Sequence, residues 1–385
     1  MNIERLLFSE SSPNLGGQEL QLLLQMTTLA QRGIDVRLAC RPGSGIAAAA
    51  AQLGLATIAT PLRMSLHPPS VVKLVRAMKA WRPDAIISHS GHDANNCALA
   101  ARLLRRRPAL LRVRTYLPGP PHAWTYNVLA DLTLVCSQAL RDELLAYPGI
   151  KPERIRVLYP GLPLARLAAE AKSPLPAHIA AWLAKHPGPL LVQAAMLRPE
   201  KGHDLLLSAL PELLKKHPTL RYVIAGDGER REQLAASIQA MKLGAHVLLA
   251  GMVTPLAPLL RRATLAVMPS SYEPFGLSQC EALSLSTPVL ASRVGGIPET
   301  VRHGETGLLV PPGERLAWVE NIAWALDHPA EMQRMADAGR DFVAREFSID
   351  VNVDRLLATI AAVITARNVR NERTQRSAQC DRPPP

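Results

Sequence analysis

Short apolar runs alternate with stretches of helical spacing from the start of the chain. Residues 3–8 and 34–40 are apolar runs typical of buried strands, and residues 18–32 between them repeat apolar positions along one helix face before Gly33. Strands that alternate with helices form parallel sheets, so the pattern predicts a doubly wound α/β domain. The same pattern predicts further strands at 56–60, 85–88, 109–113 and 132–136, and further helices at 47–53, 71–81 and 94–107.

A second series of strands follows a segment rich in proline and alanine at residues 162–189, which is typical of a linker between domains. Strands are predicted from Leu190 and Tyr222 onward and at 247–253 and 264–268. We therefore predict two domains, at residues 1–165 and 175–349. The last stretch, residues 367–385, is polar, rich in arginine and ends in proline, so we expect a disordered basic tail.

Two carboxylates with seven residues between them lie at one strand–loop–helix junction. The apolar run 264–268 predicts a strand, a loop with proline and glycine follows it, and residues 277–285 regain helical spacing. Glu273 is therefore expected in the loop and Glu281 about one turn inside the helix. Both would lie at the carboxyl edge of a sheet, where ligands bind in folds of this type.

The start of that helix is a candidate anion site. The backbone N–H groups of Gly276, Leu277 and Ser278 have no partner within a helix, and the positive end of the helix dipole lies behind them. Such a place attracts phosphate, while the two carboxylates nearby can accept hydrogen bonds from sugar hydroxyls. Phosphate and polyol together indicate a nucleotide-sugar, and Phe275 in the same loop is predicted to contact it.

Positive charge is concentrated in the first half of the chain. The net charge is +12, and residues 1–160 carry 19 Lys and Arg against 10 Asp and Glu, whereas residues 161–366 carry 20 of each. This excess favours an anionic membrane surface or a phosphorylated glycolipid as a partner. Nucleic acid is a weaker alternative, because only 4% of the residues are aromatic and no nucleic-acid-binding motif is present.

Cysteine usage and hydropathy point to the cytoplasm. The five cysteines are scattered and none stands in C-x-x-C spacing, which argues against a disulfide framework or a structural zinc site. No run of 18 uninterrupted apolar residues predicts a spanning helix, and the first residues lack the basic region of a signal peptide. We expect a cytoplasmic protein that can contact the inner membrane peripherally.

Residues 269–312 carry a family resemblance. The E-x7-E pair, followed in register by TPVLASRVGGIPE and HGETGLLVPPG, resembles the donor-site signature of the retaining glycosyltransferases of family 4. These enzymes have the GT-B fold, in which two Rossmann-like domains with doubly wound parallel sheets face each other across a cleft. The resemblance also implies that a last helix, at about residues 350–366, crosses back onto the first domain. Bacterial lipopolysaccharide and envelope glycosyltransferases are the members that the chain resembles.

In the first domain the resemblance implies an acceptor side. Gly16 and Gly17, at a strand-to-helix turn, match the family's glycine loop, which reaches toward the donor phosphates. His89 lies in a loop of the kind that lines the acceptor side. Arg114 stands where many relatives place a histidine, so the role of that histidine does not carry over. We assign Arg114 to a substrate phosphate, with a structural salt bridge as the alternative.

In the second domain the resemblance implies the nucleotide-sugar site. Arg198 and Lys201 match the family's R-x-x-x-K-G diphosphate clamp, shortened here by one residue. Gly251 lies in the strand and loop that run beside the nucleobase in relatives. Glu281 would accept hydrogen bonds from the ribose hydroxyls, and Glu273 from those of the donor sugar.

The implied reaction is transfer of a sugar from a nucleotide-sugar to a glycolipid or oligosaccharide, with retention of configuration and front-face attack. No D-x-D sequence occurs, so no metal ion or cofactor is predicted, and Arg198, Lys201 and helix N-termini would stabilise the leaving diphosphate. Lipopolysaccharide core is the acceptor that the envelope resemblance favours. A sugar-nucleotide epimerase with the same fold and a non-catalytic nucleotide-sugar-binding protein remain alternatives. The nucleotide base and the donor sugar stay open.

Overall fold

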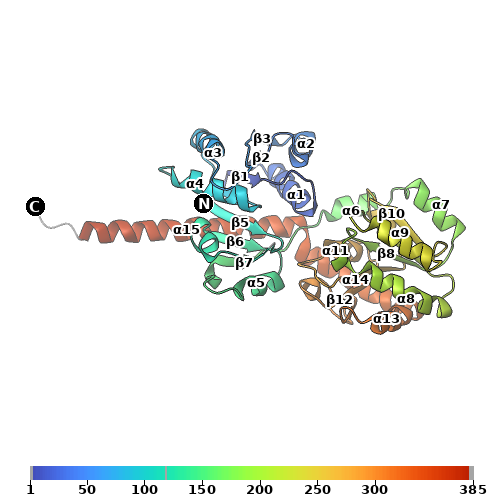
Figure 1. The fold of residues 1–385 in the computed structure, drawn as a ribbon. Helices are drawn as coiled ribbons and strands as arrows, with labels where there is room; N and C mark the ends of the chain where they lie inside the picture. The colour runs from blue at the N-terminus through green and yellow to red at the C-terminus, as the bar shows by residue number, and fades with distance from the viewer. Residues whose placement is uncertain (1–2, 118, 381–385) are drawn as a thin grey trace, which may run out of the picture. The chain divides into compact units, whose positions relative to one another are not determined.

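The computed structural model of the protein describes residues 3–117 and 119–380. The chain divides into two compact units (Figure 1): unit 1 holds residues 1–161 together with those from 349 onward, and unit 2 holds residues 162–348. The first domain was predicted to end at residue 165, four residues beyond the limit at 161, and the second to span 175–349, whereas unit 2 begins 13 residues earlier, at 162, and ends at 348. Residues 162–189, predicted as a linker with a helix, contain two helices and belong to unit 2.

Unit 1 is built on a parallel sheet of seven strands within the described residues, in the order β3-β2-β1-β4-β5-β6-β7. Leu6 of β1 is in register with Val36 of β2 on one side and with Ala85 of β4 on the other. The strand order reverses between β1 and β4, so residues that follow these two strands meet at one point of the carboxyl edge. The strands are β1 Arg5–Glu10, β2 Asp35–Cys40, β3 Ala56–Ala59, β4 Ala85–Ser88, β5 Ala109–Arg114, β6 Leu132–Val135 and β7 Ile155–Val157.

Helices cover both faces of the unit 1 sheet, as a buried parallel sheet requires. Apolar residues of α1, α2 and α15 share one core cluster with one face of the sheet, and those of α3 and α4 share another with the opposite face. The helices are α1 Gly17–Gln31, α2 Gly45–Gln52, α3 Pro68–Trp81, α4 Gly91–Arg102, α5 Gln138–Leu145 and α15 Ile349–Cys380, with a π turn η1 at Thr125–Leu129 and a 3-10 turn η2 at Pro152–Arg154.

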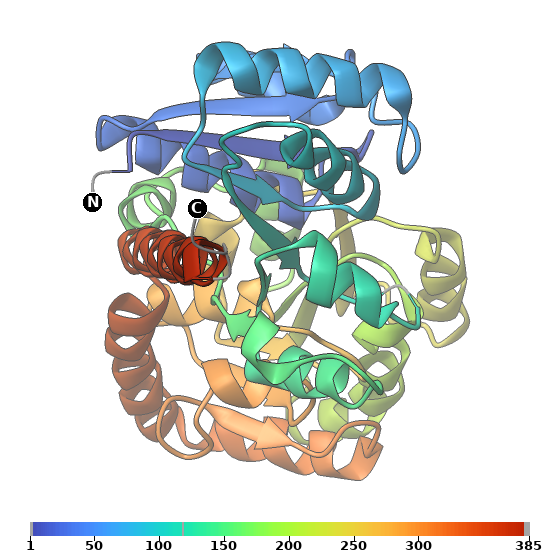
Figure 2. The same cartoon turned by 90° about the vertical axis from the view of Figure 1, so that its left-hand side faces the viewer.

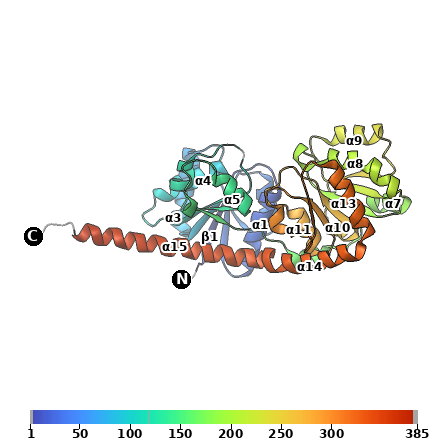
Figure 3. The ribbon, with the colours of Figure 1, turned by 90° about the horizontal axis from the view of Figure 1, so that it is seen from below.

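Two predictions for unit 1 are corrected. The helix predicted at 94–107 spans Gly91–Arg102, so the arginines that follow lie in the connection to β5. The helix α15 packs against α1 and β5 and continues to Cys380, and Figure 3 shows it as one long helix. Figure 2 looks along its axis. Residues 367–380, predicted to be disordered, are therefore helical, since no glycine or proline interrupts them, and residues 381–385 lie outside the described residues.

Unit 2 repeats the same plan with a parallel sheet of six strands in its described residues, in the order β10-β9-β8-β11-β12-β13. The order reverses between β8 and β11. Its core contains Trp318 and Tyr222, both fully buried. The strands are β8 Leu190–Ala194, β9 Arg221–Ala225, β10 Val247–Gly251, β11 Leu265–Met268, β12 Val289–Ser292 and β13 Leu308–Val310. The helices are α6 Leu164–Glu170, α7 Ala177–Lys185, α8 His203–Lys216, α9 Arg231–Ala240, α10 Ala257–Arg262, α11 Leu277–Ser284, α12 Ile297–Thr300, α13 Arg315–Asp327 and α14 Pro329–Phe347, with a 3-10 turn η3 at Pro199–Lys201.

The predicted fold class, two doubly wound parallel-sheet α/β units, is confirmed by these two strand orders. Across residues 3–117 and 119–380, no helix has both the length and the apolar character needed to cross a bilayer.

Candidate functional site

Two of the predicted site residues meet at the carboxyl edge of the unit 2 sheet. Lys201 follows β8 and Glu273 follows β11, the two strands between which the strand order reverses. The Lys201 Nζ donates to Glu273 Oε2 at 2.7 Å, and the two side chains are only 17% and 11% exposed. Ligands of open α/β sheets bind at such reversal points, so this ion pair marks the candidate site of unit 2.

Buried polar groups hold Lys201 in place. The Gln193 side-chain amide, fully buried on β8, donates to the Lys201 carbonyl at 2.7 Å, and the Tyr222 hydroxyl donates to Gln193 Oε1. Gly202 has φ +70°, and a Cβ there would lie 2.0 Å from the Pro269 carbonyl oxygen. The R-x-x-K-G turn is therefore closed against the end of β11, a contact that only glycine permits at this position.

A second glycine turn holds Glu273. The Gly296 N–H donates to the Glu273 carbonyl at 2.9 Å, and a Cβ at Gly295 would lie 2.1 Å from the same oxygen. The two glycines thus pack against the backbone of the loop that carries the carboxylate. They therefore help to position Glu273.

The helix α11 begins at Leu277, as the spacing predicted, with Gly276 as its N-cap at φ +88°. None of the N–H groups of Gly276, Leu277 and Ser278 donates a hydrogen bond to any described residue. The Ser278 hydroxyl donates to the Ala194 carbonyl at 2.7 Å and so ties the helix start to the end of β8. These free N–H groups begin three residues after Glu273. At a helix N-terminus they form an electropositive site that is suited to phosphate.

Glu281 lies inside α11 and is partly exposed. Burial of its carboxyl raises the pKa to about 7, while Arg166 on α6 opposes this and Glu170 on α6 adds to it. No hydrogen bond to this carboxylate occurs among the described side chains. A carboxyl without a partner that titrates near neutrality is typical of a functional position.

The remaining unit 2 predictions fall at the same edge but differ in exposure. Arg198 is exposed and its guanidinium forms no ion pair with a described residue, so it is free to meet an anion. Gly251 ends β10 with φ +72°, and its carbonyl accepts from the Gly226 N–H at 2.8 Å. Phe275 is 4% exposed and packs edge to face on Phe347 at 5.4 Å. Its ring belongs to the core, and its backbone carbonyl accepts from the Gln279 side-chain amide at 3.0 Å.

In unit 1, Gly16 and Gly17 start α1 after the loop that follows β1. The Gly16 N–H donates to Glu19 Oε2 at 2.7 Å, so it is already satisfied, while no atom lies within 4 Å of a Cβ built on Gly17. Of the two predicted glycines, Gly17 is therefore the one whose backbone has space for a ligand beside it.

His89 is 4% exposed, and burial lowers its pKa to about 4. Its Nδ1 has no partner among the described residues. It lines a cavity of about 30 Å³ whose polar lining includes Gln18, Gln21 and Thr115. A neutral imidazole and neutral side chains in a cavity of this size suit an uncharged hydroxyl or a water molecule.

Arg114 ends β5 at the same edge, and its guanidinium lies beside Gly91 at the start of α4. It makes no ion pair with a described residue, and its Nε is buried without a partner. The alternative of a structural salt bridge therefore finds no carboxylate in the described structure.

Two carboxylates not predicted from the sequence lie at the reversal point of unit 1: Glu10 at the end of β1 and Asp93 in α4, both fully buried. Glu10 accepts from the Gln18 amide at 2.7 Å and from the Ser90 hydroxyl, and Asp93 accepts from the Ser9 hydroxyl at 2.7 Å. Burial, with Glu10 as the next cause, raises the pKa of Asp93 to about 8. The position of Glu10 at the end of the first strand was the available signal.

Comparisons with known proteins agree with this architecture. The family model described as Glycosyltransferase Family 4 matches residues 15–166, and that described as Glycosyl transferases group 1 matches residues 176–342. Glycogen synthase of Mycobacterium tuberculosis is 29% identical over 70% of this chain and 66% of its own length. D-inositol 3-phosphate glycosyltransferase of Streptomyces coelicolor is 33% identical over 63% of this chain and 57% of its own. The match thus spans less than two thirds of each relative.

The fold is that of solved GT-B glycosyltransferases. The crystal structure of Anabaena HepE in complex with UDP superposes with a TM-score of 0.80 and 21% identity, covering 94% of this chain and all of that one. The two family models lie in tandem and together account for most of the chain. The chain therefore carries a Glycosyltransferase Family 4 match followed by a Glycosyl transferases group 1 match, on two parallel-sheet units of the GT-B type.

Proposed function

We propose that this chain transfers a sugar from a nucleotide-sugar to a phosphate-bearing glycolipid or oligosaccharide, with retention of configuration. The observation that carries the proposal is the contact between Lys201 and Glu273 at the reversal point of the unit 2 sheet, with the free N–H groups of α11 three residues further on. This arrangement supplies a cation and helix N–H groups for a diphosphate, and carboxylates for hydroxyl groups.

In the proposed reaction the bond between the sugar C1 and the diphosphate oxygen breaks, and an acceptor hydroxyl oxygen bonds to C1 on the same face. The acceptor proton passes to the leaving phosphate. Lys201, Arg198 and the α11 N–H groups stabilise the negative charge that develops on the diphosphate, an electrostatic effect that needs no rearrangement during the reaction. Glu273 accepts from the donor sugar and Glu281 from the ribose. No metal ion or other cofactor is part of this proposal.

The proposed acceptor rests on the positive charge of residues 1–160 and on the name of one relative. Residues 1–160 carry nine more positive than negative side chains, and one relative is named for a phosphorylated polyol, D-inositol 3-phosphate. Both favour an acceptor that bears phosphate, and the envelope resemblance makes lipopolysaccharide core our first choice. We place the reaction at the cytoplasmic face of the inner membrane.

The proposal is tested by thermal-shift screening of UDP-, GDP-, ADP- and CMP-sugars, followed by measurement of nucleoside diphosphate release with and without glycolipid. We expect one base to stabilise the protein, by about 2.7 kcal/mol at a hundredfold excess over Kd. Lys201→Met should remove most of this shift. Lys215→Met, an exposed lysine in the last turn of α8, is the matched control and should keep it.

Three outcomes separate the alternatives. Release of nucleoside diphosphate only when acceptor is present supports transfer. Conversion of the donor without acceptor would assign an epimerase, and donor binding without turnover on any acceptor would assign a binding protein. If no nucleotide stabilises the protein, the site assignment in unit 2 fails.

A further inference from the structure

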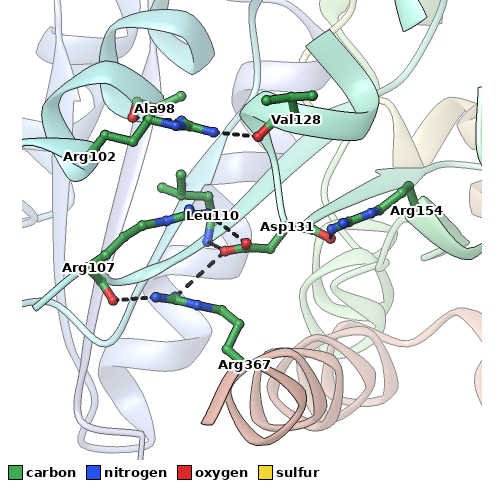
Figure 4. A network of polar contacts seen from close by, with 8 residues as sticks. All are labelled: Ala98, Arg102, Arg107, Leu110, Val128, Asp131, Arg154 and Arg367. Carbon is green, nitrogen blue, oxygen red and sulfur yellow. Dashed lines mark hydrogen bonds and ion pairs between the residues drawn. The ribbon is translucent and has the colours of Figure 1, made fainter. Parts of the chain in front are cut away.

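Arginines gather around a single carboxylate at the amino-terminal edge of β5, β6 and β7 (Figure 4). Asp131, just before β6, accepts from Arg107 at 2.6 Å and lies 3.6 Å from Arg367 of α15. Its backbone carbonyl accepts from Arg154 at 3.0 Å. Two guanidinium groups thus face one carboxylate, and that of Arg154 bonds to the backbone of the same residue, which leaves excess positive charge at this edge.

Arg102 adds a further positive charge that reaches no carboxylate. In Figure 4 its guanidinium donates to the carbonyl oxygens of Ala98 and Val128, the first at 2.9 Å. Burial lowers its pKa, and the positive charge of Arg107 lowers it further. Arg105 and Arg106 follow in the connection to β5, are exposed, and make no ion pair with a described residue. The surface here carries several positive charges that the described side chains leave uncompensated.

Large apolar side chains are exposed beside these arginines. Leu103, the C-cap of α4, is 60% exposed, Trp124 before η1 is 60% exposed and Val128 within η1 is 47% exposed. The Arg102–Val128 hydrogen bond joins the two segments, and α4 and η1 contact each other. The three exposed side chains therefore come from neighbouring segments. An exposed apolar group rimmed by cations is a feature of interaction sites.

We propose that this surface docks the protein on an anionic bilayer. It is called here the α4–η1 patch and comprises Arg102, Leu103, Arg105, Arg106, Trp124 and Val128. Arginines attract anionic headgroups, while tryptophan and aliphatic side chains enter the interface between headgroups and acyl chains. The patch lies at the amino-terminal edge of the unit 1 sheet, and the candidate residues of unit 1 lie at the carboxyl edge. Membrane docking therefore leaves the candidate residues of unit 1 accessible. The inference does not rest on the transferase activity.

The test is flotation of the full chain with two kinds of vesicle. One is neutral phosphatidylcholine, and the other contains about 30 mol% phosphatidylglycerol, which gives the vesicle a negative surface potential. We expect binding to the anionic vesicles only, falling as salt increases. Arg105→Ala with Arg106→Ala should weaken the partition coefficient about 30-fold, since each arginine near the surface contributes about fivefold. Trp124→Ser should weaken it about tenfold through the loss of inserted apolar area.

The matched control is Arg261→Ala with Arg262→Ala, an exposed pair at the end of α10 in unit 2 that removes the same charge. Equal loss of binding in both double variants would overturn the inference, because it would show a response to net charge alone. Absence of flotation with anionic vesicles, or binding to DNA in its place, would overturn it as well. Unchanged unfolding temperatures confirm that the variants fold, and unchanged transfer to a soluble acceptor would separate docking from catalysis.

Discussion

The Lys201–Glu273 ion pair gives a quantitative prediction. We consider Lys201→Met, Glu273→Gln and the double variant, which keep the approximate shape of each side chain. At 2.7 Å the direct attraction between unit charges is about 6 kcal/mol at an effective dielectric constant of 20. Desolvation of two mostly buried groups offsets most of this, so the net contribution of such a charged hydrogen bond is about 1.5–3 kcal/mol. We expect a coupling free energy of about 2 kcal/mol.

The assay is denaturant unfolding of the four proteins in a double-mutant cycle. Each single variant leaves the partner charge buried and unpaired, so each should lose about 3 kcal/mol of the free energy of unfolding, and the double variant should lose less than the sum. Because two units can unfold separately, the transition of unit 2 must be resolved. Costs that add to within about 0.5 kcal/mol would refute a direct contact.

The same variants separate binding from turnover. Glu273 neutralises Lys201 in the unliganded protein, so Glu273→Gln should bind a nucleoside diphosphate at least as tightly as the parent while turnover falls. Lys201→Met should lose diphosphate affinity. Tighter binding by Lys201→Met would contradict the assignment of this lysine to the diphosphate.

Three further predictions concern single positions. Because the pKa of Glu281 is raised to about 7, nucleotide affinity measured by calorimetry should rise with pH through 7, and Glu281→Gln should flatten that part of the profile; a profile shared by both proteins would exclude this group. Gly202→Ala should cost more than about 2 kcal/mol in unfolding, since its Cβ would meet the Pro269 carbonyl at 2.0 Å. Gly304→Ala, with a similar positive φ and open space, is the control for backbone strain, and equal costs would exclude the clash. Because the folded pKa of Asp93 is raised to about 8, the folded state keeps a proton that the unfolded chain loses from about pH 4 upward. The free energy of unfolding should therefore fall between about pH 4 and 8, and Asp93→Asn should remove this decline; an unchanged slope in that variant would assign it to other groups.

Local sequence patterns were sufficient to predict the strand and the helix on either side of the loop that carries Glu273. The strand predicted at 264–268 is β11 at Leu265–Met268, and the helix predicted at 277–285 is α11 at Leu277–Ser284. An apolar run, a proline–glycine loop and helical spacing are local signals, so each element could be placed without knowledge of its neighbours. The E-x7-E spacing then located both glutamates relative to the helix start.

The contacts that organise the site could not be predicted, because they join distant segments. The ion pair spans 72 residues, and the Gln193 amide that holds Lys201 depends on the Tyr222 hydroxyl of another strand. Neither residue stands out in its own stretch, since glutamine and tyrosine in apolar strands carry no spacing signal.

Two predicted helix ends were wrong, one taken from helical spacing and one from polar composition. Helical spacing continues past Arg102, but α4 stops there, where the Arg102 side chain turns to the Val128 carbonyl of η1. Polar composition after residue 366 suggested disorder, yet α15 continues, and Arg367 donates to the Arg107 carbonyl at 2.9 Å. In both cases the residue at the predicted limit makes a contact with a distant segment that its own stretch of sequence does not reveal.

The most direct test of the account is a crystal structure of the protein with a bound nucleoside diphosphate. We expect the diphosphate at the carboxyl edge of the unit 2 sheet, within hydrogen-bond distance of the Lys201 Nζ and of at least one N–H group of residues 276–278, with the ribose hydroxyls on Glu281. A diphosphate bound elsewhere, with Lys201 and the start of α11 both left without a phosphate contact, would contradict the central claim.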